Sequence, residues 1–330
     1  MKQTDKTCEV EKRPLKLVFG ITYKCNIKCR HCCADNGDIQ VPDPLHTDLL
    51  RWLNCLPRER VEMVCFGGGE PFLKYHDLIE YCKILKEKSI SAATLTNGFW
   101  GKNKEHAVNM LQKIDGLKSI FISVDQFHQE SISDEVIENS IDAVLKTGKY
   151  LLLKSTHISS EDKKNQQRKY AKYFPRVMTV SSRLMTAGAA GALSVEKFTL
   201  KNNPEQFGKD CTIGDLFVNH TGGVYLCCPT ANQGKDSLNP FYLGNIDEDG
   251  WDTIFQNAGK NRILSSVLKR GPIFLVDLFK ETPYYDELLN VEFYSECDMC
   301  YHLFKDEDKV SILNKYLKSN MNTKTETMGI

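Results

Sequence analysis

Short apolar runs alternate with amphipathic stretches from residue 15 to about residue 182. The short runs predict buried strands, and the apolar spacing between them predicts helices. The predicted strands cover 15–21, 61–66, 90–96, 119–124, 150–156 and 176–182, and the predicted helices cover about 47–56, 75–88, 102–114, 134–146 and 161–173. This alternation is typical of βα units that build a parallel sheet in an α/β fold. Periodicity leaves open whether the sheet is doubly wound and flat or forms a partial barrel.

The pattern changes after residue 182, where small residues and glycines dominate 184–194. We therefore expect a tail at 1–14, a barrel-like or sheet domain at 15–182 and a linker at 183–209. A cysteine-rich α+β domain is expected at 210–304, followed by a helix and polar tail at 305–330. Residues 217–225 have the pattern of a β-hairpin around a glycine turn.

Composition excludes several classes of protein. The 330 residues include 43 basic and 43 acidic side chains, so no net charge draws the chain to nucleic acid or to a membrane surface. The charged N-terminus lacks the apolar core of a signal peptide, and no apolar stretch is long enough to cross a bilayer. We predict a cytoplasmic protein with neither nucleic acid nor membrane as a partner.

The thirteen cysteines are numerous for this length, and without an export signal they indicate metal binding more than disulfides. Cys25, Cys29 and Cys32 follow the first predicted strand with C-x3-C-x2-C spacing. Three local thiolates can hold one face of a [4Fe–4S] cube and leave the fourth iron open. The alternative is a zinc site with His31 as a further ligand, which the spacing favours less.

This cysteine loop resembles that of the radical S-adenosylmethionine (SAM) enzymes. The resemblance implies a partial (β/α)6 barrel with ligands at the carboxyl ends of its strands. It also implies a cluster whose open iron is chelated by SAM and a reductant of the flavodoxin or ferredoxin type. One electron would cleave SAM to methionine and a 5′-deoxyadenosyl radical, which abstracts a substrate hydrogen atom. Such oxygen-sensitive chemistry agrees with a cytoplasmic location.

Further strand ends resemble SAM-binding positions of this family. Gly68-Gly69-Glu70-Pro71 is similar to the GGEP motif that holds the SAM amino group, where glycines allow close approach and the carboxylate receives an ammonium. Asn97, Ser123 and Asp125 follow the third and fourth strands at positions that contact SAM in relatives. For each of them a turn or helix cap is the alternative role.

Three more residues are candidates around the same site. His31 lies where the backbone of relatives approaches the adenine of SAM. Arg183 could hold a carboxylate of SAM or substrate, or form a surface ion pair. His128, like Asp125, is a candidate catalytic residue as a proton acceptor, although a structural role is the alternative.

A second cysteine set lies in the last third of the chain. Cys211, Gly222 and Cys227 form a C-x10-G-x4-C pattern, and Cys297-x2-Cys300 follows much later. The pattern resembles the auxiliary-cluster domains called SPASM or, when shortened, twitch. No cysteine follows Cys300, which favours a twitch-type domain with one auxiliary cluster, expected to be [4Fe–4S].

Full ligation by four cysteines would suit electron transfer, and a structural zinc is the alternative. Cys228 could replace Cys227 as a ligand of the auxiliary cluster, and Cys33 could replace Cys32 in the first cluster.

These features predict an oxidoreductase that modifies or cross-links a ribosomally made precursor peptide. The alternative enzyme is a radical SAM dehydrogenase of a small molecule such as a sugar or cyclitol. An alternative of another class is a non-catalytic zinc protein or electron carrier. Glu70 in the GGEP pattern argues against a carrier, because a carrier needs no SAM-binding groups.

Overall fold

The computed structural model describes residues 15–34, 41–193, 203–207, 211, 214–227 and 238–319. Two compact units result, and each is described by itself. The barrel unit comprises Pro14–Leu200 with Val218–Thr221, and the cysteine-rich unit comprises Lys201–Phe217 and Gly222–Ile330 together with the N-terminal residues. Some of the predicted parts lie outside the described residues. They are the tail at 1–14, the last residues of the C-terminal tail, much of the linker, and Cys228.

Six parallel strands form the sheet of the barrel unit. They are β1 (Leu15–Thr22), β2 (Val61–Gly68), β3 (Ser91–Thr96), β4 (Leu117–Ser123), β5 (Tyr150–His157) and β6 (Met178–Arg183). Each strand pairs in parallel with the next one along the chain, so the order runs from β1 to β6 without reversal. A doubly wound sheet would reverse its order at a switch point. The consecutive order therefore favours the partial barrel of the two predicted arrangements.

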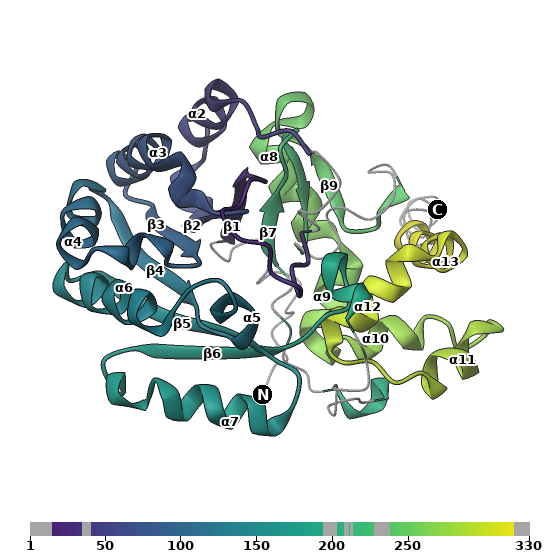
Figure 1. Cartoon of the computed structure of the whole chain (residues 1–330). Helices are drawn as coiled ribbons and strands as arrows, with labels where there is room; N and C mark the ends of the chain where they lie inside the picture. Colours follow the sequence, from purple (N-terminus) through teal and green to yellow (C-terminus); the bar gives the residue numbers. More distant parts are fainter. Residues whose placement is uncertain are drawn as a thin grey trace, which may run out of the picture. The chain divides into compact units, whose positions relative to one another are not determined.

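Helices connect these strands close to the positions that the apolar spacing predicts. They are α2 (His46–Asn54), α3 (Tyr75–Glu87), α4 (Lys104–Lys113), α6 (Asp134–Lys146) and α7 (Ser160–Lys169). Figure 1 shows α3, α4 and α6 along the same side of the strands. The contact between β2 and α3 is aromatic: the ring centroids of Phe66 in β2 and Tyr81 in α3 lie 5.7 Å apart, and both side chains are buried.

Local sequence signals explain where these helices begin and end. Ser159 caps α7 by accepting a hydrogen bond from the Asp162 backbone N–H at 3.0 Å, and Asn103 caps α4 through the His106 N–H at 2.8 Å. Gly148, which the sequence places at the end of a helix, follows α6 with a φ of +70°. Glycine adopts this left-handed conformation without strain, so the chain can turn there into β5.

The cysteine-rich unit contains a small antiparallel element and a series of helices. β7 (Asp215–Val218) and β8 (Gly223–Tyr225) are neighbours in the sheet, and Gly222 between them has a φ of +81°. The hairpin that the sequence predicts at 217–225 is therefore present. β8 also pairs antiparallel with β9 (Tyr242–Asn245).

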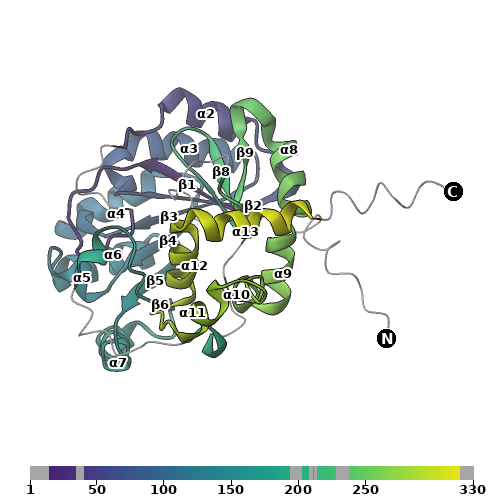
Figure 2. The same cartoon turned by 90° about the vertical axis from the view of Figure 1, so that its right-hand side faces the viewer.

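The chain after β9 is more helical than the mixture of strands and turns that we expect from the sequence. It forms α8 (Ile246–Lys260), α9 (Arg262–Arg270), α10 (Ile273–Asp277), α11 (Tyr284–Asn290), α12 (Glu296–Lys305) and α13 (Glu307–Lys318). Figure 2 shows α12 leading into α13, with α9 and α10 nearby. Two of these helices, α10 and α11, span only one or two turns, which is too short for a clear 3.6-residue period. No helix in the described part of the chain combines the length and apolar character that crossing a bilayer demands.

His157 makes the stability of the barrel unit sensitive to acid. Its side chain is buried at the end of β5, and Nδ1 lies 2.7 Å from the Ser181 hydroxyl oxygen. Burial, with the charges of Lys163 and Arg183, lowers the pKa of His157 from 6.5 to about 4. Because the unfolded chain binds this proton more readily, the stability contribution is present above pH 6.5 and lost as pH falls toward 4.

We expect this histidine to remove up to about 3 kcal/mol of unfolding free energy between pH 6.5 and pH 4, at about 1.4 kcal/mol for each pKa unit. Urea unfolding of the wild type and of His157→Gln across this range measures the effect. The variant should show a flatter dependence on pH. If the unfolding free energy of the two proteins changed equally with pH, His157 would not be the source of this pH dependence.

Candidate active site

The cysteine loop leaves the carboxyl end of β1 and brings three thiols together. The Cys32 N–H donates to the Cys29 carbonyl at 3.1 Å, which closes a tight turn between them. Burial raises the pKa of Cys25 and raises that of Cys29 to about 12, and the Cys32 thiolate contributes to both shifts. Thiols that disfavour one another's charge need cations to become thiolates. The donor set therefore fits the iron ions of a cluster held by Cys25, Cys29 and Cys32.

Asp43 fixes the start of this loop. Its carboxylate Oδ1 accepts hydrogen bonds from the Thr22 hydroxyl and from the Tyr23 N–H, both at 2.9 Å. Its Oδ2 forms an ion pair with Lys74 at 3.2 Å. The sequence analysis missed Asp43, for which the only signal is a carboxylate between two prolines.

The other end of the cysteine loop is held from a distant segment. The Ala189 N–H, in the 3₁₀ helix Gly188–Ala192, donates to the Cys32 carbonyl at 3.0 Å. This helix belongs to the glycine-rich stretch that the sequence analysis assigns to a loop or linker. The stretch thus helps to position the last predicted cluster ligand.

Gly68 and Gly69 bring the end of β2 against the backbone of the cysteine loop. The Gly69 N–H donates to the Thr22 carbonyl at 2.6 Å, and the Glu70 N–H donates to the Lys24 carbonyl at 2.9 Å. A Cβ atom on Gly68 would lie 2.1 Å from the Thr22 oxygen, and one on Gly69 would lie 2.0 Å from the Lys24 oxygen. The sequence predicts close approach to a ligand here; the structure shows close approach to the protein's own backbone.

Glu70 is buried, with 1% of its surface exposed. Oε1 accepts hydrogen bonds from the Phe72 N–H at 3.1 Å and the Thr96 hydroxyl at 2.8 Å, while Oε2 accepts from the Asn97 N–H at 2.8 Å. Burial raises the pKa of Glu70 to about 7 despite these donors. The carboxylate joins the GGEP turn to the end of β3, and its predicted contact with the SAM amino group stays a prediction.

Asn97 extends this connection to the cysteine loop itself. Its Nδ2 donates to the Asn26 side-chain oxygen at 2.9 Å and lies 3.8 Å from the Cys25 sulfur. Ser123, at the end of β4, is buried and pairs with Lys154 of β5. The ends of β2 and β3 therefore meet the cysteine loop through backbone and side-chain contacts.

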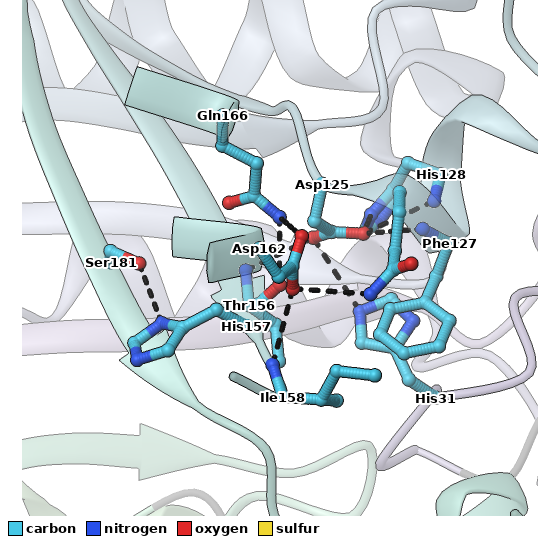
Figure 3. A network of polar contacts seen from close by, with 11 residues as sticks. His31, Asp125, Phe127, His128, Thr156, His157, Ile158, Asp162, Gln166 and Ser181 are labelled. Atoms are coloured by element: carbon cyan, nitrogen blue, oxygen red, sulfur yellow. Dashed lines mark hydrogen bonds and ion pairs between the residues drawn. The ribbon is translucent and has the colours of Figure 1, made fainter. Parts of the chain in front are cut away.

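Asp125 is the centre of a buried polar network (Figure 3). It caps the short helix α5 (Gln126–Gln129), where Oδ1 accepts from the N–H groups of Phe127 and His128 and lies 2.8 Å from His128 Nδ1. Oδ2 accepts from the Thr156 N–H at 3.3 Å. Burial alone would raise the pKa of Asp125, but its hydrogen bond and charge interaction with His128 hold it below the usual value. Its expected contact with SAM and its catalytic role stay predictions.

The side chain of His31 joins this network from the cysteine loop. His31 Nε2 lies 3.6 Å from Asp125 Oδ2, and its ring stacks on Phe127 with centroids 4.5 Å apart. One ligand atom each of Cys29, His31 and His128 lie within 4.8 Å of one another. Sequence analysis gives His31 a backbone role toward SAM or, in the alternative zinc site, a role as a ligand, whereas in the structure its side chain links the loop to α5. A sulfur and two imidazoles at this spacing would also suit zinc, so metal analysis is part of the functional test.

Asp125→Ala should destabilise the protein strongly, because it leaves the buried N–H of Phe127 and the half-buried N–H groups of His128 and Thr156 without their acceptor. We expect a loss of about 3 kcal/mol or more in urea unfolding. Asp125→Asn should lose less, since its amide oxygen can still accept. The matched control is Asp142→Ala, which removes an exposed ion pair with Lys104 and should cost less than about 1 kcal/mol. Equal losses in the two alanine variants would contradict a structural role for Asp125.

Arg183 ends β6 opposite His157, two residues after Ser181. Ser181 and Thr179 line a cavity with Gln166 of α7 and Tyr170, which follows α7, so alternation places Arg183 on the α7 side of the strand. A role in binding a carboxylate stays a prediction.

Three cysteines of the second set lie near one another within the cysteine-rich unit, namely Cys211, Cys297 and Cys300. Cys297 and Cys300 lie three residues apart in α12, on one face of the helix. Burial and the charges of Cys211 and Cys297 raise the pKa of Cys300 well above its usual value. Next to Cys227, Leu226 accepts from the Gly214 N–H at 3.1 Å and donates to the Phe241 carbonyl at 2.9 Å. The electrostatic interactions place Cys211 and Cys297 near Cys300, and a cluster held by these three with Cys227 stays a prediction.

Two protein-family models match the chain. The Radical SAM superfamily model matches residues 20–155, and the SPASM model, an iron–sulfur cluster-binding domain, matches residues 211–301. The chain belongs to the radical SAM superfamily, in its SPASM group. The partial barrel, the cysteine-rich domain, and the SAM and iron–sulfur cofactors that the sequence implied are thereby confirmed.

Individual relatives agree with this assignment. The chain is 22% identical over 315 residues to the putative peptide biosynthesis protein YydG of Bacillus subtilis, covering 92% of this chain and 96% of the relative. It is 30% identical over 137 residues to the Fe-coproporphyrin III synthase of Methanosarcina barkeri, which covers 41% of this chain and 33% of that enzyme.

Solved structures share the fold at low sequence identity. Streptococcus suis SuiB, bound to its precursor peptide SuiA, gives a TM-score of 0.58 at 16% identity, covering 87% of this chain and 78% of SuiB. The enzyme anSMEcpe with bound AdoMet gives a TM-score of 0.56 at 16% identity, covering 94% of this chain and all of that chain. These likenesses show the fold alone.

Proposed function

We propose that this protein is a radical SAM enzyme that oxidatively modifies or cross-links a ribosomally made precursor peptide. The observation that carries the radical SAM chemistry is the convergence of Cys25, Cys29 and Cys32 beside a GGEP turn whose backbone is bonded to the cysteine loop. The support for a peptide substrate is the match to a peptide biosynthesis protein over 96% of that protein's length. The match to a porphyrin-modifying enzyme covers a much smaller part of both chains.

The chain's own residues would hold and orient the cofactors. Cys25, Cys29 and Cys32 would bind the first cluster, which together with SAM supplies a 5′-deoxyadenosyl radical. Glu70 and Asn97 hold the GGEP turn and the end of β3 against the cysteine loop. Ser123 and the backbone of His31 would contact SAM, as the resemblance implies. Asp125 keeps α5 and β5 in place beside them.

Cys211, Cys227, Cys297 and Cys300 would bind one auxiliary cluster. With four thiolate ligands this cluster would have no open iron, so it suits electron transfer better than substrate binding. A net oxidation, such as a cross-link, then needs no external oxidant. The first electron would come from a reductant of the flavodoxin or ferredoxin type.

Anaerobic reconstitution with iron and sulfide tests this function. We expect about eight irons per chain, and 5′-deoxyadenosine on addition of dithionite and SAM. Mass spectrometry of small peptides encoded beside the gene, incubated with the active protein, would then reveal the substrate through a loss of hydrogen. Zinc without sulfide, or full clusters without SAM cleavage, would overturn the proposal in favour of a zinc protein or an electron carrier.

A further inference from the structure

β6, the last strand of the barrel unit, is at the edge of the sheet that the described residues form. Among the described strands, β6 pairs only with β5, and the six residue pairs between them run without a bulge. The segment Met178–Arg183 contains no proline, and each of its residues is exposed or half-buried. Native sheets usually protect an edge of this length by a bulge, a proline or a cover, because its free N–H and C=O groups can pair with another chain.

The two faces of this edge differ in character. Leu153, Ser155, Thr179 and Ser181 line the cavity beside α7, so these residues face the helix. Alternation along the strands places Leu152, Lys154, Met178 and Val180 on the opposite face. There Met178 is 70% exposed and Val180 is 46% exposed, while Tyr150 at the start of β5 is 78% exposed. Along Met178–Ser182 the edge therefore joins backbone groups that face away from β5 to an apolar row.

This face continues to the candidate active site. Ser123 pairs with Lys154, and Lys154 pairs with Val180, so the three residues form one row across β4, β5 and β6. At about 4.8 Å between neighbouring strands, Val180 lies about 10 Å from Ser123 along the sheet. A strand added to β6 would lie about 5 Å further, within reach of a site that includes Ser123.

We propose that β6 binds an extended segment of the peptide substrate by backbone hydrogen bonding, as a seventh strand of the barrel sheet. This proposal rests on the proposed function and specifies how the peptide is held. Apolar side chains of the segment would pack on Met178 and Val180. Lys154 is exposed and forms no ion pair with any described residue, so an acidic side chain of the segment would face it. An open edge selects an extended backbone, which a compact small molecule does not offer.

Peptide selection tests the chemistry of this surface. A phage library of random 12-residue peptides is selected on the reconstituted wild type and on Lys154→Glu. The wild type should enrich apolar sequences with an Asp or Glu, and the variant should enrich Lys or Arg at that place. The strongest wild-type peptide should bind Val180→Lys at least tenfold more weakly by fluorescence anisotropy. Leu45→Lys, at a leucine before α2 that is 66% exposed, should bind it as the wild type does.

Hydrogen exchange of the same complex locates the contact. Amides of 178–183 should exchange more slowly when the peptide is bound, as expected for a new strand. Protection elsewhere, unchanged affinity in Val180→Lys, or failure to select any peptide would overturn the proposal. Protection of 178–183 without peptide that grows with protein concentration would assign the edge to a second copy of this chain and overturn it too.

Formation of 5′-deoxyadenosine by the wild type without peptide is measured in parallel. Its absence would defeat the proposed function, while the exchange and affinity data would still decide whether β6 binds peptides.

Discussion

Cys29→Ala is expected to abolish 5′-deoxyadenosine formation and to remove about four of the roughly eight irons per chain. The reason is that Cys25, Cys29 and Cys32 are the predicted ligands of the loop cluster, and burial together with the neighbouring thiols raises the pKa of Cys25 and Cys29. Two remaining thiolates would not retain a cube against dissociation. Iron and sulfide analysis after anaerobic reconstitution, with chromatographic assay of 5′-deoxyadenosine, measures both effects.

Matched cysteine variants sharpen this prediction. Cys55→Ala, at an exposed position after α2, should keep all the iron and the full activity. Cys33→Ala should also keep the loop cluster, whereas Cys32→Ala should behave like Cys29→Ala, which settles the choice between the two neighbours. Cys300→Ala should lose the other four irons. Retention of every iron in Cys29→Ala would show that the loop does not hold a cluster.

Much of the barrel unit could be predicted from sequence because each of its elements carries a local signal. Each predicted strand and helix falls within a few residues of an observed one, since alternating apolar runs and capping residues such as Asn103 and Ser159 act over short distances. The strand order could not be derived from periodicity, because it depends on pairings between segments far apart in the chain. Of the helices after β9, the sequence predicted the last one, within 305–330, and missed the others, the shortest of which leave little periodicity.

The candidate site also has a part that could be predicted from the sequence and a part that could not. The spacing of the cysteines and the Gly68-Gly69-Glu70 motif identified the residues that converge on the loop. The contacts that hold these residues in place could not be predicted from the sequence. Asp43 bonds to the loop from about twenty residues away, and the Asp125 network joins His31 to the Thr156 backbone. Such contacts are set by tertiary packing, and the residue types involved are as common in ordinary turns and caps.

Gly69→Ala is expected to destabilise the protein by about 3 kcal/mol and to deplete the loop cluster, because overpacking against backbone cannot be relieved by a side-chain rotation. The new Cβ would lie 2.0 Å from the Lys24 oxygen and 2.5 Å from the Lys24 carbonyl carbon, so the cysteine loop would have to move. Gly67→Ala is the matched control. Its Cβ would lie 3.8 Å from a Val18 methyl group, an ordinary contact, and should change stability by less than about 1 kcal/mol.

The two possible roles of Gly69 give different results in this experiment. If Gly69 were needed only to admit SAM, Gly69→Ala would retain about eight irons and normal urea unfolding, and would lose only SAM cleavage. If Gly69 is needed for the hydrogen bonds from Gly69 and Glu70 to the loop backbone, iron content and unfolding free energy should fall together. The structure favours the second outcome, because the clash is with the peptide that immediately precedes Cys25. The motif would then act on SAM through the shape of the cysteine loop as well as through its own polar groups.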